Sequence, residues 1–270
     1  MKIKKILGLV CLTIVSFLLL LVVRARGENT TNILVGGTNG GYVKADANYA
    51  DNLKPEATPE ATPDIWPQID IDAEETRQMY SIVNRDNLLS SAFMPETDVI
   101  DGFNAYFNVI GLDDLNAFVA AIREAGFDVC IRSAYKGYQY QAYLFNGYAS
   151  QYWYGHETEM TYEEAVQLAE QVVMYPGSSE HQLGLAIDLY DKYYTTVDYN
   201  KMNKAFYEWV DTHCAEYGFI KRYPTRKQMI TGWDEPWHYR YVGQEAATFI
   251  MENGLSYEEF YAHYNSSFSY

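Results

Sequence analysis

Apolar side chains recur at helical spacing in several parts of the chain. Residues 113–126 and 201–218 each carry one apolar stripe that a glycine ends, Gly126 or Gly218. Capping boxes, Thr161 with Glu164 and Ser256 with Glu259, predict helices over 161–174 and 256–264. A further helix is expected over 243–254. The two stripes consist of Leu115, Phe118, Val119 and Ile122, and of Phe206, Trp209, Val210, Cys214 and Tyr217.

Short strand-like runs lie between these helices. Residues 127–133 (FDVCIRS) and 185–188 (LAID) are strand candidates, and residues 135–148 are expected to run from a loop into a helix. Helices and short strands are mixed without a regular β-α-β order. The sequence therefore predicts an α+β fold.

The N-terminus combines basic and apolar residues in an order typical of export. Lys2, Lys4 and Lys5 precede an apolar run over residues 6–23. As a helix, at about 1.5 Å per residue, this run nearly crosses a hydrocarbon core of roughly 30 Å. It is long for a signal peptide, and no A-x-A cleavage pattern follows it. Residues 1–26 are therefore predicted to be a single-pass signal anchor with the rest outside the cytoplasm; cleavage and secretion are the alternative.

The segment after this run has the composition of a spacer. Residues 27–74 are mostly polar and include the acidic, proline-containing repeat PEATPEATPD. Such a tract cannot bury a core and favours extended conformations. We expect a disordered linker over 27–74 and a folded domain over 75–270, acting as a monomer.

Charge and cysteine content exclude two classes of protein. The formal net charge of −16 argues against a nucleic-acid partner, because the phosphate backbone requires a basic surface. The chain has three cysteines and no CxxC pair, which excludes a cysteine-based zinc module. Cys130 and Cys214 could form a disulfide, but two free thiols are the favoured interpretation.

The chain has five histidines, and one of them, His181, stands seven positions before Asp188. On a regular strand, residues seven apart point to opposite faces, and on a helix they lie roughly 10 Å apart along the axis. A bend at Gly184 would bring the two side chains together. Residues 185–188 would then form a strand, with Asp188 facing away from the core.

A second candidate pair, Glu235 and His238, lies in the aromatic segment TGWDEPWHYRYVG. A hydrolytic zinc site needs three protein ligands and one open position. His181, Asp188 and His238 would supply them, and Glu235 would act as general base near the ion. The other three histidines, His156, His213 and His263, are expected to have no part in the site.

Two segments that carry these residues resemble the VanY-like D-alanyl-D-alanine carboxypeptidases of bacterial cell walls. They span residues 176–189 and 217–243, and the resemblance extends over about residues 75–262. It implies a small central antiparallel sheet flanked by helices, as in the Hedgehog and DD-peptidase group, together with Zn²⁺ and a peptidoglycan stem peptide as substrate. The family pattern, S-x-H-x6-D followed by E-x-W-H, is matched by Ser179, His181, Asp188, Glu235, Trp237 and His238.

The resemblance also implies roles for three more side chains. Residues 133–141 (SAYKGYQYQ) correspond to the substrate-binding segment, in which Lys136 stands where the family usually has arginine. Lys136 is expected to stabilise the oxyanion, with Arg132 as a less favoured substitute. Gln141 and Ser179 are expected to hydrogen-bond the substrate.

The predicted activity is zinc-dependent removal of the C-terminal D-Ala from stem peptides that end in D-Ala-D-Ala. The same residues would serve an L,D-carboxypeptidase acting on tetrapeptide stems. A third hypothesis is a non-catalytic wall-binding module stabilised by zinc. Glu235 argues against this module, and so does the three-ligand set, because structural zinc sites are normally closed by four protein ligands.

Overall fold

The computed structural model describes residues 66–74, 76–192 and 201–269. The predicted anchor, and the predicted linker as far as residue 65, lie outside these ranges. The helices are α1 (Arg77–Tyr80), α2 (Leu112–Glu124), α3 (Tyr138–Trp153), α4 (Tyr162–Ala169), α5 (Lys204–His213), α6 (Gln228–Thr231), α7 (Gln244–Glu252) and α8 (Tyr257–Tyr264). The strands are β1 (Thr97–Val99), β2 (Tyr106–Asn108), β3 (Val129–Ser133), β4 (Ala186–Asp191), β5 (Phe219–Tyr223) and β6 (Glu235–Tyr241).

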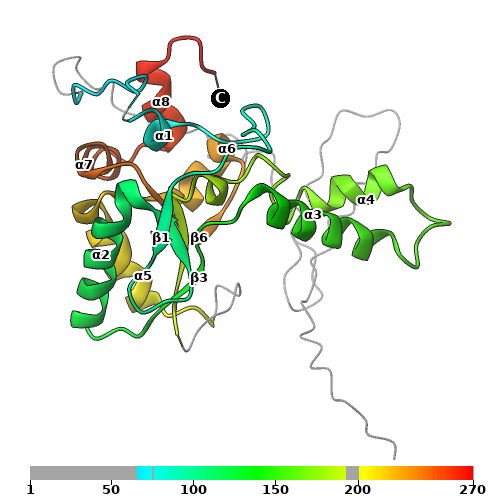
Figure 1. The fold of residues 1–270 in the computed structure, drawn as a ribbon, viewed down its shortest axis with the longest axis horizontal. Helices are drawn as coiled ribbons and strands as arrows, with labels where there is room; N and C mark the ends of the chain where they lie inside the picture. The colour runs from blue at the N-terminus through cyan, green and yellow to red at the C-terminus, as the bar shows by residue number, and fades with distance from the viewer. Residues whose placement is uncertain (1–65, 75, 193–200, 270) are drawn as a thin grey trace, which may run out of the picture. The chain divides into compact units, whose positions relative to one another are not determined.

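A four-stranded antiparallel sheet in the order β3-β4-β6-β5 forms the centre of the domain, and β1 pairs with β2 in a separate hairpin. Helices flank the sheet (Figure 1). The predicted α+β class is therefore confirmed. None of the helices in the described ranges has the length and apolar character that a membrane-spanning helix requires.

The larger hydrophobic core lies between the sheet and two helices, α2 and α5. The predicted stripe of α2 is completely buried there, together with Phe206 and Val210 of α5. From the sheet come alternating residues, such as Ile187 and Leu189 of β4, as expected for a strand with one face on a core. The alternation leaves Asp188 between them on the other face.

A second core, formed by α7, α8 and the segment before α1, packs beside Ile220 of β5 and Val242, which follows β6. Ile71 is buried in it, and Trp66 stacks on the ring of His263 with 3.8 Å between ring centroids. The sequence assigned residues up to 74 to the linker, but residues 66–74 pack on the domain. The reason is that apolar side chains occur every few positions after the proline-containing repeat.

Helices α3 and α4 lie against each other and project from the sheet, on the side away from α2 and α5 in the view of Figure 1. The helix expected after residue 135 is α3, which starts at Tyr138. The capping box of α4 is present as predicted, and so is that of α8. The helix α4 ends at Ala169, earlier than the expected residue 174.

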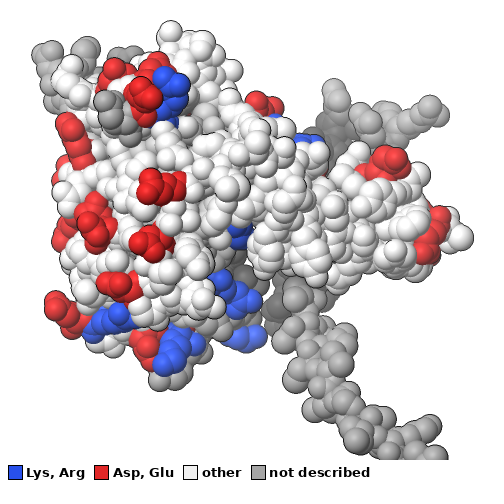
Figure 2. All heavy atoms as spheres, viewed as in Figure 1, with Lys and Arg blue, Asp and Glu red and all other residues white. Residues whose placement is uncertain are grey.

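Acidic side chains are spread over the face of the domain that Figure 2 shows, with small groups of basic side chains between them. Cys130 and Cys214 are both free thiols, as favoured from the sequence. Burial raises the pKa of Cys214 to about 12, so this thiol is held in its neutral form.

Candidate metal centre and active site

His181 lies in a short 3-10 helix, Glu180–Leu183, and a hydrogen bond on the Nδ1 side holds its ring in place. The carbonyl oxygen of Ala134 lies 2.8 Å from Nδ1 of His181, and the backbone N–H of Lys136 donates to the carbonyl of His181 at 3.0 Å. The Nε2 atom is left facing Asp188, with 3.3 Å to Oδ2. The segment after β3 therefore fixes which nitrogen of His181 is offered to the site.

The predicted bend occurs at Gly184, which has a φ of 70°. A side chain here would strain the backbone, and a Cβ atom would lie 3.3 Å from both the backbone N and the Cβ of Asn108. The bend turns the chain from the 3-10 helix into β4. His181 and Asp188 thus meet, although no regular element would join residues seven apart.

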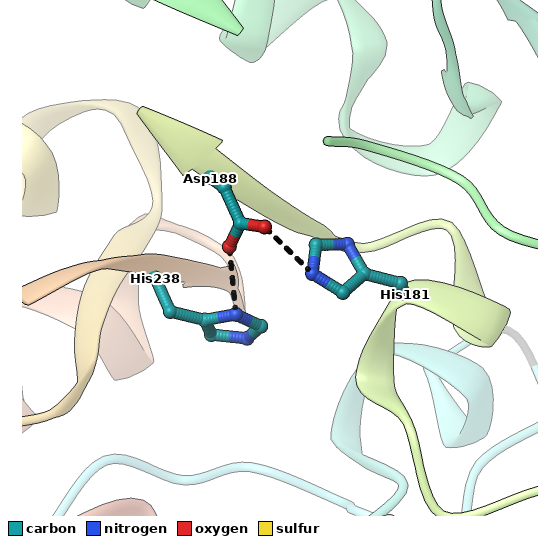
Figure 3. A group of neighbouring side chains, drawn as sticks. All are labelled: His181, Asp188 and His238. Atoms are coloured by element: carbon teal, nitrogen blue, oxygen red, sulfur yellow. Dashed lines mark hydrogen bonds and ion pairs between the residues drawn. The ribbon is translucent and has the colours of Figure 1, made fainter. Parts of the chain in front are cut away.

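Asp188 and His238 are direct partners across the antiparallel strands β4 and β6. Side chains of directly opposed residues lie on the same face of a sheet, with Cβ atoms about 5 Å apart. The Oδ1 atom of Asp188 lies 3.1 Å from Nδ1 of His238. Figure 3 shows the Asp188 carboxylate between the two imidazole rings, one oxygen toward each.

Glu235 reaches the same side of the sheet because the pairing of β5 and β6 is irregular. On a regular strand, Glu235 and His238 would point to opposite faces. Pro236, Trp237 and His238 of β6 span the gap that Arg222 alone spans on β5. As a result, Oε2 of Glu235 lies 3.6 Å from Nδ1 of His238.

His181, Asp188 and His238 can together hold a metal ion. One ligand atom from each lies within 4.8 Å of the others. For both histidines the nitrogen that faces away from Asp188 has its own acceptor: the Ala134 carbonyl for His181, and Glu180 for His238. Two imidazole nitrogens and one carboxylate, with their outer partners in place, fit the donor set of a catalytic zinc site.

The two histidines differ in pKa because their electrostatic environments differ. Burial lowers the pKa of His181 to about 4, and the charge of Lys136 adds to this effect, so His181 is neutral at neutral pH. Burial also acts to lower the pKa of His238, but hydrogen bonds to Asp188 and Glu180 outweigh it and raise the pKa to about 9. In the absence of metal, His238 therefore carries a proton that an incoming cation would displace.

Glu235 has the electrostatics of a general base. Burial raises the pKa of this carboxyl group to about 7, against the lowering effect of His238, while the nearby Asp188 raises it further. A pKa near the working pH allows a group both to accept and to release a proton. Such a shift, next to a possible metal site, is typical of catalytic carboxylates.

Lys136 lies in the loop between β3 and α3 and is partly buried. Burial lowers the pKa of its ammonium group, and the opposing charges of Asp188 and Glu235 counteract this. The lysine therefore places its charge close to these two carboxylates. Arg132, the less favoured candidate, is exposed on β3 and its guanidinium lies over the ring of Tyr190 at 5.9 Å.

Gln141 and Ser179, expected to bind substrate, are both buried. The amide nitrogen of Gln141 donates to the Met174 carbonyl at 2.6 Å, and its amide oxygen has no hydrogen-bond partner in the described part of the chain. Ser179 immediately precedes the 3-10 helix and makes no capping hydrogen bond. Their roles toward a substrate stay predictions.

The remaining histidines have local contacts elsewhere. His156 lies 3.2 Å from Glu159, and His213 stacks on Trp209 within α5. His263 stacks on Trp66. None of the three belongs to the group of possible metal ligands found in the described ranges.

Glu180 was missed by the sequence analysis. Its Oε2 atom lies 3.4 Å from Nε2 of His238, and its Oε1 atom accepts from Nε of Arg222 at 2.8 Å. Burial alone would raise the pKa of Glu180, but Arg222 and Arg240 outweigh it and hold the pKa well below its usual range. The available signal was the presence of ionisable residues within buried segments, which require partners.

The chain matches the sequence model of the VanY family, D-alanyl-D-alanine carboxypeptidase, over residues 105–244. It is 30% identical to the putative carboxypeptidase YodJ of Bacillus subtilis over 210 residues, which is 71% of each protein.

Two solved structures are similar to this fold. One is the vancomycin-resistance D,D-pentapeptidase VanY from a VanB-type cassette, a mutant in complex with Zn(II): 33% identity, TM-score 0.57, 68% of this chain and 98% of that one. The other is the LdcB LD-carboxypeptidase: 30% identity, TM-score 0.59, 68% of this chain and 85% of that one. Together with the matched residues, these findings show that the chain belongs to the VanY family of D-alanyl-D-alanine carboxypeptidases.

Proposed function

We propose that the protein is a zinc-dependent carboxypeptidase that removes the C-terminal D-Ala from peptidoglycan stem peptides ending in D-Ala-D-Ala. One observation carries the proposal: the ligand atoms of His181, Asp188 and His238 converge within 4.8 Å, with Glu235 beside them. Membership of the VanY family and the Zn(II) complex of a related VanY support it.

His181, Asp188 and His238 would hold the zinc ion through Nε2, a carboxylate oxygen and Nδ1. When bound, zinc supplies a Lewis acid that acidifies water and polarises a carbonyl group. Because the protein provides three ligands, a position remains open for the reactants. A structural zinc site would normally lack this opening.

Glu235 acts as the proton carrier in the proposed reaction. It accepts a proton from the attacking water as the new C–O bond forms at the peptide carbonyl. It then gives this proton to the leaving amine of the terminal D-Ala as the C–N bond breaks. Its pKa of about 7 suits both steps at neutral pH.

Lys136 stabilises the negative charge that develops on the carbonyl oxygen. Its ammonium group is close enough to Asp188 and Glu235 for their charges to raise its pKa against the effect of burial, and partial burial strengthens its electrostatic effect. The role of Gln141 toward the substrate rests on the family resemblance; its buried amide oxygen has no protein partner in the described residues.

The similarity to LdcB, an LD-carboxypeptidase, favours one alternative, removal of D-Ala from a tetrapeptide stem. A hydrolysis assay with penta- and tetrapeptide stems tests both activities. Release of D-Ala from the pentapeptide, lost with a chelator and restored by zinc, is expected. Release from the tetrapeptide alone would favour the alternative, and release from neither would favour a wall-binding module.

The location of the enzyme is proposed from the sequence alone. Residues 1–26 anchor the monomeric protein in the cell membrane, and the following spacer places the catalytic domain outside the cytoplasm. The apolar run over residues 6–23 is the basis for this. Cell fractionation should recover the full-length chain with the membranes; a shortened, freely secreted form would instead indicate a cleaved signal peptide.

A further inference from the structure

Glu180 joins the proposed metal ligand His238 to a cluster of buried charges. One carboxylate oxygen faces Nε2 of the His238 ring at 3.4 Å. The other receives Nε of Arg222 at 2.8 Å and lies 3.0 Å from Nη1 of Arg240. Both oxygens are therefore committed to cationic or N–H groups of the protein.

The cluster is closed to solvent and balanced in charge. Glu180, Arg222 and Arg240 are at most 1% exposed, and Glu258 is 5% exposed. Arg222 donates through Nη1 and Nη2 to the two oxygens of Glu258, at 3.1 and 2.6 Å. Two carboxylates thus face two guanidinium groups, an arrangement in which buried charges are tolerated because each has a partner.

The two arginines fix the orientation of the Glu180 carboxylate. Arg222 also donates hydrogen bonds to Glu258, at the start of α8. Arg240 is anchored through Nη2 to the carbonyl groups of Met79 and Ser81. The oxygen of Glu180 that faces His238 is consequently held on one side of the ring, and Nδ1 is left facing Asp188.

We propose that Glu180 is a positioning residue: by accepting the Nε2–H of His238 it fixes the ring so that Nδ1 is the metal ligand, and so strengthens zinc binding. The inference rests on the proposed zinc site. Removal of a residue that hydrogen-bonds to a metal ligand commonly weakens metal binding by about 10- to 100-fold. Glu258 binds Arg222 but does not contact His238, so the proposed positioning role belongs to Glu180 alone.

Glu180→Gln and Glu258→Gln form a matched pair of variants. Each removes one negative charge from the same buried cluster, but only Glu180 contacts His238. Zinc affinity of the full-length protein would be measured by competition with a chromophoric chelator, with thermal unfolding of the metal-free form as a folding control. Glu180→Gln should weaken zinc binding by about 10- to 100-fold, and Glu258→Gln by less than about threefold.

The inference is overturned if Glu180→Gln binds zinc as wild type does, or if both variants lose affinity equally. Failure of the wild-type protein to bind zinc would contradict the proposed function itself, so the two failures can be told apart.

A measurement on the wild-type protein covers the case in which Glu180→Gln does not fold. In the cadmium-113 form, NMR should show coupling of the metal to both carbon-bound ring protons of His181, but only to Hε1 of His238. This difference arises because a metal bound at Nε2 is three bonds from both ring protons, whereas a metal bound at Nδ1 is three bonds from Hε1 and four from Hδ2. Coupling to both ring protons of His238 would overturn the inference.

Discussion

Asp188 and His238 face each other directly across strands β4 and β6, and each oxygen of Asp188 points to a different histidine. The sheet therefore sets the separation of two proposed ligands, and the bend at Gly184 brings the third. The site therefore depends on two separate features of the fold, the pairing of β4 with β6 and the bend at Gly184. This arrangement also makes the contributions of single residues separable by mutation.

Glu235→Gln should abolish hydrolysis and keep the metal. The substitution removes the proton acceptor but no ligand, so kcat should fall by several orders of magnitude, on the scale of about 10³-fold or more. Metal analysis and steady-state kinetics check this. Asp234→Asn, a change at the neighbouring carboxylate, is the control and should stay near wild type; turnover of Glu235→Gln within about tenfold of wild type would exclude Glu235 as the base.

Lys136→Ala should lower kcat/KM by about 2–4 kcal/mol of transition-state stabilisation, comparable to the loss of one oxyanion donor. Lys136→Arg should retain activity, because the guanidinium also carries a positive charge. Kinetics on a D-Ala-D-Ala stem peptide distinguish these outcomes. Arg132→Ala, at the exposed arginine, serves as the control. A wild-type rate for Lys136→Ala would show that the lysine does not stabilise the transition state.

Zinc binding should release about one proton per chain at pH 7.5. His238, with its pKa raised to about 9, is protonated in the metal-free protein, whereas His181, with its pKa lowered to about 4, is already neutral. Calorimetry in buffers with different ionisation enthalpies measures the release, which should decrease by about one proton as the pH rises through 9. Release that does not change with pH would contradict the assignment of the proton to His238.

The same protonation affects the stability of the metal-free domain. The folded-state pKa of His238 lies above the ordinary value of 6.5, so the folded protein holds the proton more strongly than the unfolded chain does. This contribution is fully present below about pH 6.5 and is lost as the pH rises through about 9. Zinc should remove this pH dependence, since it takes the place of the proton.

Gly184→Ala should destabilise the domain by more than Gly126→Ala. Both glycines have positive φ, 70° and 91°, so alanine strains the backbone at either position by about 1–2 kcal/mol. At Gly126 nothing lies within 4 Å of the added Cβ, whereas at Gly184 it lies 3.3 Å from two atoms of Asn108. Thermal unfolding of the two variants measures the difference. Equal midpoints would show that the site tolerates the added atom.

The three possible metal ligands that the structure brings together could be predicted from residue types and spacing. His181, Asp188, His238 and Glu235 stand in short segments with few other ionisable groups, and Gly184 marked the bend. The α+β class followed from the order of helical and strand-like patterns. Neither the ligand prediction nor the fold-class prediction depends on how distant segments of the chain pair.

Features that depend on long-range packing could not be predicted. Glu180 contacts Arg222 and Arg240, and Arg222 in turn binds Glu258. These partners come from three other elements, and no local sequence pattern predicts that they converge. The bulge that turns Glu235 toward His238 depends on the register of β5 against β6. The packing of residues 66–74 likewise depends on α7 and α8, which lie about 170 residues later in the chain.

Reconstitution of the metal-free, full-length protein with zinc tests the central claim most directly. As zinc is added, release of D-Ala from a pentapeptide stem should rise and reach a plateau at about one zinc per chain, as expected of a single three-ligand site. His181→Ala should show neither the bound zinc nor the activity, and His213→Ala should behave as wild type. Hydrolysis that is independent of zinc, or a His181→Ala variant with unchanged zinc content, would contradict the account.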